Sequence, residues 1–320
     1  MSGPAEREGV PERSATEDES VSFTVGPDER GERLDRVVVR HVPALGRRAA
    51  ASLFAEGRVF VRGRVARKGD PATDGDVVTL SVTSTAPIDP EPGDLVVVLE
   101  RPDLVVVDKP AGMPTAPLRL GEAGSLAGRL LARYPEMRRI GHRPREPGLV
   151  HRLDTETSGL VVAARTAAAF EHLTRALSEG RLEKRYLAVV AGEDFPAEVT
   201  ATHPLGPDAR NRARVRVFSP GSPEGRPSTT RLSRVRSAAG RTLVEASASP
   251  AYRHQVRAHL AALGWPILGD PTYGGTRAPE LAPGRHALHA SYVAWAGDDV
   301  VRGFSARAEL PPDLGALFPG

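Results

Sequence analysis

The segment from Val150 to Leu160 places one carboxylate, Asp154, between an arginine and a turn-forming Thr/Ser/Gly stretch. A Pro/Gly-rich approach over 144–148 precedes this segment, and an apolar run over 160–164 follows it. Loop residues that rigid elements carry are where catalytic groups concentrate. A lone Asp more often caps a turn. The charged neighbours of Asp154 favour a positioned carboxylate that takes part in chemistry.

Further segments along the chain carry side chains that could take part in chemistry. A predicted strand ends in Lys109-Pro-Ala-Gly112, and a Lys-Arg-Tyr segment ends at Tyr186. A His-Gln-Val-Arg-Ala-His block covers 254–259 and continues into a Gly/Pro-rich stretch over 264–274. The segment 287–290 reads Ala-Leu-His-Ala. In order and spacing, these segments together with 149–159 resemble the RluA-type pseudouridine synthases from residue 95 to about residue 315.

The resemblance implies roles for individual side chains. Asp154 corresponds to the essential Asp of that family, and Tyr186 to its active-site Tyr. Arg257 is expected to pair with the carboxylate. This chain has Ala-Tyr-Arg at 251–253 where the family usually has Gly-Arg-Thr, so Arg253 is the alternative partner. The other expected substrate-binding or loop-supporting residues are His151, Arg152, Leu153, which is expected at the pocket wall, and Lys109.

Pseudouridine forms when the N1–C1′ bond of a uridine is cut, the uracil turns, and a bond to C5 replaces it. All bonds change within one nucleotide, so we expect no cofactor and no metal. Asp154 would add to the sugar or take a sugar proton, and in either case it must be ionised. Burial raises the pKa of a carboxyl group, and a neighbouring Arg opposes that shift. Tyr186 can stack on uracil and take part in the late proton transfer from C5.

A uridine in structured RNA must be flipped out, which costs a few kcal/mol per base. Basic side chains that hold the flanking phosphates would offset this cost. Arginines recur with period two at 210–216, and on a strand this spacing sets them on one face. An ordinary solvated face is the alternative reading. The four side chains are Arg210, Arg212, Arg214 and Arg216.

Residues 21–83 are expected to form a separate small domain. Leu34, Val37 and Val38 have helical spacing, 47–54 reads as a second helix, and strands are expected at 59–61 and 77–82. This order resembles the small RNA-binding domain first known from a ribosomal small-subunit protein. Its phosphate contacts would come from Arg47, Arg48, Arg58, Arg62, Arg64, Arg67 and Lys68.

The rest of the chain divides into a tail, a linker and a large domain. Residues 1–20 are polar and acidic, and we expect them to be disordered. Residues 84–94 carry prolines and read as a stiff linker, and 95–320 as the catalytic domain. Strands and helices alternate there without a regular strand–helix repeat. We expect an α+β fold with a mixed, largely antiparallel sheet and flanking helices.

The composition of the chain limits which classes of protein it can belong to. The chain has no Cys, no apolar run long enough for a membrane span and no signal-like start, so we expect a soluble, cytoplasmic protein and a monomer. Residues 1–30 carry a net charge of −5, which leaves +8 on the rest and suits a polyanionic partner. No nucleotide-binding Gly-rich loop is present. The pairs His254/His259 and His286/His289 read as structural rather than metal-binding.

The predicted function is an RNA pseudouridine synthase that acts on structured RNA, ribosomal RNA first and transfer RNA second. A catalytically silent RNA-binding protein with the same fold is the first alternative, and the altered segment 251–253 is its only support. A carboxylate glycosidase is the second alternative. It would need a second catalytic acid, for which Glu156 is the nearest candidate.

Overall fold

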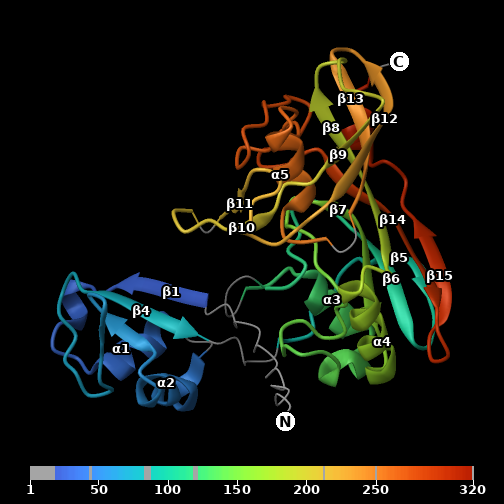
Figure 1. The fold of residues 1–320 in the computed structure, drawn as a ribbon. Helices are drawn as coiled ribbons and strands as arrows, with labels where there is room; N and C mark the ends of the chain where they lie inside the picture. The colour runs from blue at the N-terminus through green and yellow to red at the C-terminus, as the bar shows by residue number, and fades with distance from the viewer. Residues whose placement is uncertain are drawn as a thin grey trace, which may run out of the picture. The chain divides into compact units, whose positions relative to one another are not determined.

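The computed structural model describes residues 19–42, 45–82, 88–117, 122–211, 213–248 and 251–318 (Figure 1). The chain divides into two compact units. The smaller unit comprises residues 1–86 with 119–121, and the larger unit comprises 87–118 with 122–320. The predicted disordered tail lies outside the described residues, apart from its last two positions, where the first strand begins.

The smaller unit packs two helices on a four-stranded antiparallel sheet with the order β1-β4-β2-β3. The apolar positions that predicted the first helix, Leu34, Val37 and Val38, are buried against Leu53 and Val59. Both predicted helices and both predicted strands are present. The elements are β1 (Glu19–Thr24), a 3₁₀ turn η1 (Pro27–Glu29), α1 (Leu34–His41), α2 (Gly46–Ala55), β2 (Val59–Val61), β3 (Arg64–Val65) and β4 (Val77–Val82).

The larger unit is built on a nine-stranded sheet with the order β5-β6-β7-β14-β8-β13-β12-β9, in which β15 also pairs with β14. Neighbouring strands are antiparallel except β7 and β14, which are parallel. The predicted mixed, largely antiparallel α+β fold is therefore confirmed. The strands are β5 (Val96–Glu100), β6 (Leu104–Lys109), β7 (Ser158–Ala164), β8 (Glu183–Ala191), β9 (Glu198–Ala201), β12 (Thr230–Ala238), β13 (Arg241–Ser247), β14 (Leu288–Gly297) and β15 (Arg302–Arg307).

Helices cover both faces of strand β7. Val161 belongs to the core cluster that contains Leu130 of α3, whereas Val162 belongs to the cluster that contains Leu173 of α4. Every residue of β7 is buried, which explains the uninterrupted apolar run in the sequence. The helices are α3 (Leu126–Arg133), the 3₁₀ turn η3 (Pro135–Arg139), α4 (Ala167–Ser178), α5 (Gln255–Ala262) and α6 (Pro312–Gly315).

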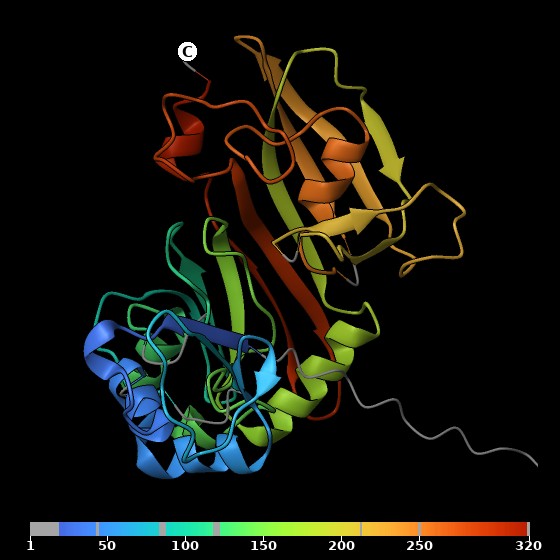
Figure 2. The same cartoon turned by 90° about the vertical axis from the view of Figure 1, so that its left-hand side faces the viewer.

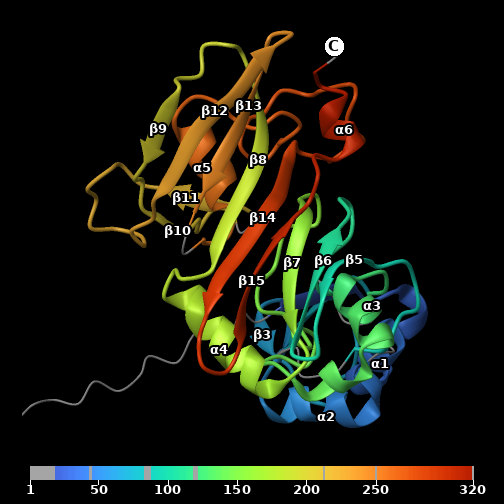
Figure 3. The same ribbon diagram turned by 90° about the vertical axis from the view of Figure 1, so that its right-hand side faces the viewer.

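Helix α5 lies over one face of the β8–β13–β12 part of the sheet (Figure 2), and the opposite view shows these strands with no helix in front of them (Figure 3). Val256 and Leu260 pack into the same core cluster as Val244. A short separate hairpin of β10 (Leu205–Pro207) and β11 (Val215–Val217) lies beside α5. Helix α5 thus joins the sheet to this hairpin.

The predicted linker differs from the structure over its described part. Ile88 is buried in the core of the larger unit, and the backbone N–H of Glu91 donates to the carbonyl of Gly128 at 2.9 Å. The guanidinium of Arg129 also donates to the carbonyl of Asp94 at 2.6 Å. Residues 88–94 therefore pack on α3 instead of spanning a gap. Their prolines stiffen a segment that is already docked.

Candidate active site around Asp154

The loop of residues 153–157, here called the Asp154 loop, is held by the Lys-Pro-Ala-Gly segment. Thr115 bonds both backbone groups of Leu153, donating to its carbonyl at 2.7 Å and accepting from its N–H at 3.1 Å. The fully buried Lys109 donates to the carbonyls of Pro110, Met113 and Thr155 at 2.7–3.0 Å. Burial lowers the pKa of Lys109 to about 7, and the three carbonyls match the three N–H bonds of its ammonium form. Lys109 therefore supports the loop backbone.

A glycine sets how the Asp154 loop enters the sheet. Gly159 has a φ of +115°, and a Cβ there would lie 2.3 Å from the carbonyl oxygen of Ala290 on β14. Only glycine permits so close an approach of two backbones. Gly159 and Tyr186 both pair with Ala290, from opposite sides of β14. This register brings the tyrosine strand near the loop that carries Asp154.

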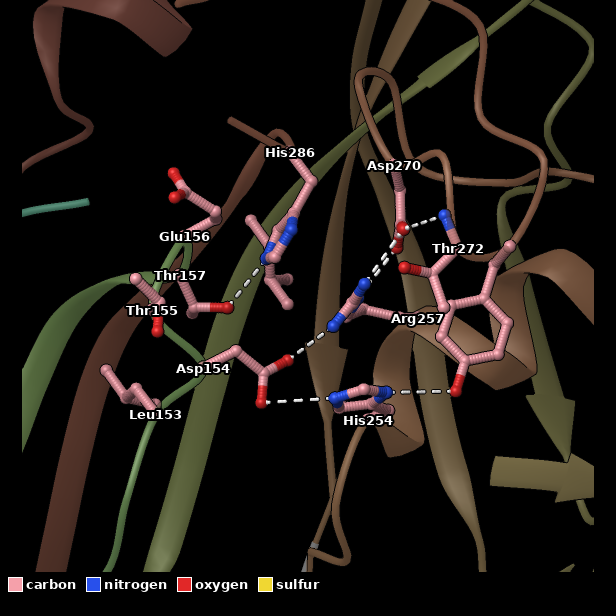
Figure 4. A network of polar contacts seen from close by, with 12 residues as sticks. Leu153, Asp154, Thr155, Glu156, Thr157, His254, Arg257, Asp270, Thr272 and His286 are labelled. Carbon is pink, nitrogen blue, oxygen red and sulfur yellow. Dashed lines mark hydrogen bonds and ion pairs between the residues drawn. The ribbon is translucent and has the colours of Figure 1, made fainter. Parts of the chain in front are cut away.

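Two carboxylates share the guanidinium of Arg257 (Figure 4). Nη1 of Arg257 donates to Oδ2 of Asp154 at 2.7 Å. Nε and Nη2 donate to the two oxygens of Asp270 at 2.6 and 2.8 Å. Asp270 is fully buried, whereas the side chain of Asp154 is 28% exposed. Asp270 therefore fixes the guanidinium, and Asp154 remains accessible. The exposed Arg253 has no described bond to Asp154, so Arg257 is the partner.

The electrostatics of the site keep Asp154 ionised. Burial by itself raises the pKa of Asp154, but the positive charges of His254, in its protonated form, and of Arg257 more than offset this effect, so the pKa lies below its ordinary value. Burial also lowers the pKa of His254 to about 4, so this imidazole is uncharged at neutral pH. Arg257 therefore supplies the positive charge beside the carboxylate.

Tyr186 lies on β8 in the core cluster, and its side chain is almost completely buried. Burial and the charge of Asp154 raise the pKa of its phenol, so the hydroxyl keeps its proton. Among the described residues, no group forms a hydrogen bond with this hydroxyl. Tyr186 therefore carries an uncommitted proton near Asp154.

The remaining residues of the motif have supporting contacts. His151 is half-buried, and its Nε2 accepts from the N–H of Val162 at 3.2 Å. Arg152 is half-exposed and pairs with Glu146 at 2.9 Å. Leu153 packs in the main core cluster. His151 thus supports the loop from within, and Arg152 retains an accessible guanidinium.

The expectation that four arginines share one strand face is wrong. Strand β11 contains only Val215–Val217, so Arg210 and Arg214 lie in the loop before it, and Arg212 lies outside the described residues. Asp208 organises this loop. It accepts from the backbone N–H of Arg210 at 2.9 Å and from the Arg214 side chain at 2.7 Å. Arg216 is exposed on the strand and stacks over the ring of Phe218 at 4.6 Å.

The basic residues predicted in the smaller unit are mostly exposed. Arg47, Arg64 and Arg67 are exposed, and Arg62 pairs with Asp76 at 2.6 Å. The side chain of Arg48 lies outside the described part of α2. The smaller unit thus presents arginines on α2 and around the turn between β2 and β3.

Sequence reasoning missed several residues of the site. Asp270 belongs to a Gly-Asp-Pro-Thr-Tyr segment whose role could not be read from residue type alone. His254 was interpreted as a structural residue, and its contact with Asp154 was not predicted. Its Nε2 lies 3.5 Å from Oδ1 of Asp154. His286 accepts from or donates to Thr157 at 2.8 Å, beside the same loop. His259 is structural, because it is buried and bonded to Thr230 and to the carbonyl of His203.

The site does not fit the glycosidase alternative. Glu156 points away from Asp154 (Figure 4), and both oxygens of Asp270 are occupied by Arg257. Within the described residues, one group has metal-ligand spacing, His172 with Asp298 and Asp299, and it belongs to α4 and the β14–β15 turn. No helix in the described ranges is long and apolar enough to span a membrane.

Comparisons with known proteins agree with this geometry. Residues 103–262 match the family model described as RNA pseudouridylate synthase. An uncharacterized RNA pseudouridine synthase of Chloroflexus aurantiacus is 37% identical over 308 residues, which cover 96% of this chain and 95% of the relative. Ribosomal large subunit pseudouridine synthase D of Neisseria meningitidis serogroup B is 31% identical over 314 residues, covering 94% of this chain and 82% of the relative.

A solved structure is also similar. Human RNA pseudouridylate synthase domain containing 1 aligns with a TM-score of 0.55 and 29% identity, over 71% of this chain and 90% of that chain. The family match, the relatives and the site therefore lead to one conclusion. The chain belongs to the RNA pseudouridylate synthase family and is an isomerase of uridine in RNA.

Proposed function

We propose that this enzyme converts specific uridines of structured ribosomal RNA to pseudouridine and that Asp154 is its essential catalytic residue. The observation that carries the proposal is the bond from Arg257 to an accessible, ionised Asp154, with Asp270 holding the other side of the guanidinium. A carboxylate fixed in this way can act at the ribose of a nucleotide that enters the pocket.

Two routes use this carboxylate. In the first, an oxygen of Asp154 bonds to C1′ as the N1–C1′ bond breaks, and the electron pair of that bond stays on N1 of uracil. In the second, Asp154 removes the proton on C2′, and a C1′=C2′ double bond forms as the N1–C1′ bond breaks with its electron pair on N1. In both routes the uracil then turns and C5 bonds to C1′, as the Asp154–C1′ bond breaks in the first route and as Asp154 returns the proton to C2′ in the second. The proton on C5 then leaves, and N1 takes up a proton. The hydroxyl of Tyr186 would take part in that last transfer as a relay, accepting the proton from C5 as it gives up its own.

RNA contact is assigned to two basic regions. The arginines of the β10–β11 hairpin, Arg210, Arg214 and Arg216, are exposed and lie in the same unit as Asp154. The smaller unit, with exposed Arg47, Arg64 and Arg67, would add a second, sequence-independent grip on phosphates. Phosphate contacts of this kind offset the cost of flipping the target uridine.

Ribosomal RNA is the favoured substrate because relatives that span most of the chain are named for the ribosomal large subunit. Transfer RNA is the competing substrate. We also propose that the enzyme meets either RNA in the cytoplasm and acts there as a monomer without cofactor or metal.

The experiment uses purified enzyme with two RNAs labelled with tritium at C5 of uridine. Release of tritium from ribosomal RNA, with little release from transfer RNA, is the expected result. The reverse preference would overturn the ribosomal assignment. Mapping pseudouridines in cells with and without the gene would then identify the position.

A further inference from the structure

A line of polar contacts joins Asp154 to the arginine-bearing hairpin. Nε2 of His254 lies 3.5 Å from Oδ1 of Asp154 (Figure 4). Nδ1 of the same ring lies 3.0 Å from the hydroxyl of Tyr273. The backbone N–H of Val215, on β11, donates to that hydroxyl at 2.9 Å. Three contacts thus lead from the catalytic carboxylate to the hairpin backbone. All of these residues belong to the larger unit.

The contacts favour one nitrogen of His254 as the carrier of the proton. The oxygen of Tyr273 already accepts from Val215, so its own O–H is available to donate to Nδ1 of His254. An uncharged imidazole that accepts at Nδ1 carries its hydrogen on Nε2. That N–H faces Oδ1 of Asp154, where a lone pair would be repelled. The opposite tautomer would leave the tyrosine O–H without this acceptor.

The backbone around His254 is adapted to this geometry. His254 has a φ of +56° and a ψ of +11°, a left-handed conformation that non-glycine residues rarely adopt. Such conformations are unfavourable for a residue with a Cβ and gather at functional sites. The residue immediately precedes α5, and its side chain is 9% exposed. The strained position aims the ring between Asp154 and Tyr273.

One short loop secures both groups that contact Asp154. Asp270 holds Arg257, which faces Oδ2, and Tyr273 holds His254, which faces Oδ1. The ring of Tyr273 also lies under the guanidinium of Arg257, 5.2 Å from its central carbon. The segment 270–273 therefore fixes the carboxylate from both sides.

We propose that His254 and Tyr273 are positioning residues that hold Oδ1 of Asp154 and couple its orientation to the seating of the β10–β11 hairpin on RNA. This inference rests on the proposed catalytic role of Asp154. Val215, which bonds Tyr273, stands between Arg214 and Arg216, the side chains assigned to phosphate contact. Phosphates that draw this hairpin into place would steady Tyr273 and His254. The 3.5 Å contact would then shorten, as catalytic contacts commonly do when substrate binds.

The first test measures the tautomer of His254 and needs no activity. Nitrogen-15 NMR of histidine-labelled enzyme, with the signal assigned through His254→Gln, should show hydrogen on Nε2 and none on Nδ1. In Tyr273→Phe, which keeps the ring and removes only the hydroxyl, the two tautomers should mix. Hydrogen on Nδ1 in the unmodified enzyme would overturn the proposal, and so would an unchanged spectrum in Tyr273→Phe.

The second test measures single-turnover tritium release at saturating RNA. Tyr273→Phe should slow release by about 3- to 10-fold, the equivalent of one lost hydrogen bond, with RNA affinity unchanged. Tyr292→Phe is the matched control, because Tyr292 lies on β14 between Arg185 and Arg307, and its rate should not change. His254→Gln, which keeps a donor, should be faster than His254→Leu. Equal rates for Tyr273→Phe and Tyr292→Phe, or for the two His254 variants, would contradict the coupling.

Comparing Asp154→Asn with Tyr273→Phe distinguishes a failure of the positioning role from a failure of the catalytic role of Asp154. Full activity in Asp154→Asn would reject the catalytic role of Asp154, whatever the histidine spectrum shows. Full single-turnover activity in Tyr273→Phe, together with loss of activity in Asp154→Asn, would reject the positioning role alone.

Discussion

Asp154 and Asp270 lie on two sides of one guanidinium, and only Asp154 reaches solvent. Arg257 donates one bond to Asp154 at 2.7 Å and two bonds to the fully buried Asp270 at 2.6 and 2.8 Å. A guanidinium has five N–H donors in a rigid plane, so it can serve both carboxylates at once. The buried carboxylate positions the arginine, and the arginine keeps the accessible carboxylate ionised.

Asp270→Asn should destabilise the fold, because the amide nitrogen of Asn cannot accept from the buried Arg257, so one of its N–H groups loses its partner. A buried donor left without a partner typically costs about 1–3 kcal/mol. Asp313→Asn is the control, since Asp313 pairs with buried Arg285 but is itself 38% exposed, and its loss should be smaller. Urea unfolding measures both free energies. Equal decreases in the free energy of unfolding of the two variants would mean that Asp270 contributes no more to stability than the partly exposed Asp313.

Arg257→Lys should move the acid limb of the pH–rate profile upward. The pKa of Asp154 lies below its ordinary value of 3.8, so the carboxylate stays ionised, and contributes stability, until the pH falls through that lowered pKa. An ammonium cannot bond both carboxylates in this plane, so the pKa of Asp154 should rise. Single-turnover rates should then show no titration of Asp154 above about pH 5 in the unmodified enzyme and a shifted limb in the variant. Superimposable profiles would contradict the assigned role of Arg257.

Arg216→Ala should weaken RNA binding and reduce its salt dependence. Arg216 is 61% exposed and lies 4.0 Å from the equally exposed Glu224, so it is accessible to a phosphate. Each lost phosphate contact lowers the slope of log K against log salt by about 0.7–0.9. Arg175→Ala, on the exposed face of α4, is the matched control and should leave the slope unchanged. Identical slopes for the two variants would remove the hairpin from the RNA contacts.

Deletion of residues 1–86 should weaken RNA affinity more than it slows the chemical step. The larger unit has its own core, so Asp154 and Arg257 should keep their geometry. We expect a loss of about tenfold in Kd, or about 1.4 kcal/mol, with the rate at saturating RNA preserved. Arg64→Glu combined with Arg67→Glu tests the same surface in the full chain. Unchanged affinity in both proteins would show that the smaller unit serves another purpose.

The sequence predicted elements where the pattern is local. The apolar run at 160–164 became the buried strand β7, and the spacing of Leu34, Val37 and Val38 became α1. The arginines that recur with period two at 210–216 predicted a strand that is mostly absent. Asp208 bonds the backbone N–H of Arg210 and the side chain of Arg214, and it keeps most of this stretch in a loop. A side-chain hydrogen bond of this kind competes with strand formation and has no periodicity.

The sequence motifs identified the residues that the structure brings together, and their catalytic roles stay predictions. Arg257 bonds Asp154, and the charge of Asp154 acts on Tyr186, although the three residues stand on a helix, a loop and a strand. The choice between Arg253 and Arg257 required the structure, in which α5 buries Arg257, whereas Arg253 precedes the helix and is exposed. The partners Asp270 and His254 could not be predicted, because their roles depend on a left-handed backbone and on contacts between distant segments.

The catalytic role of Asp154 is tested most directly by comparing Asp154→Asn with the unmodified enzyme in tritium release from C5-labelled ribosomal RNA. Asn has nearly the same shape, and Arg257 keeps Asp270, so the variant should fold and bind RNA normally. Tritium release should be abolished while RNA affinity is retained. Release at the unmodified rate would show that Asp154 is not essential.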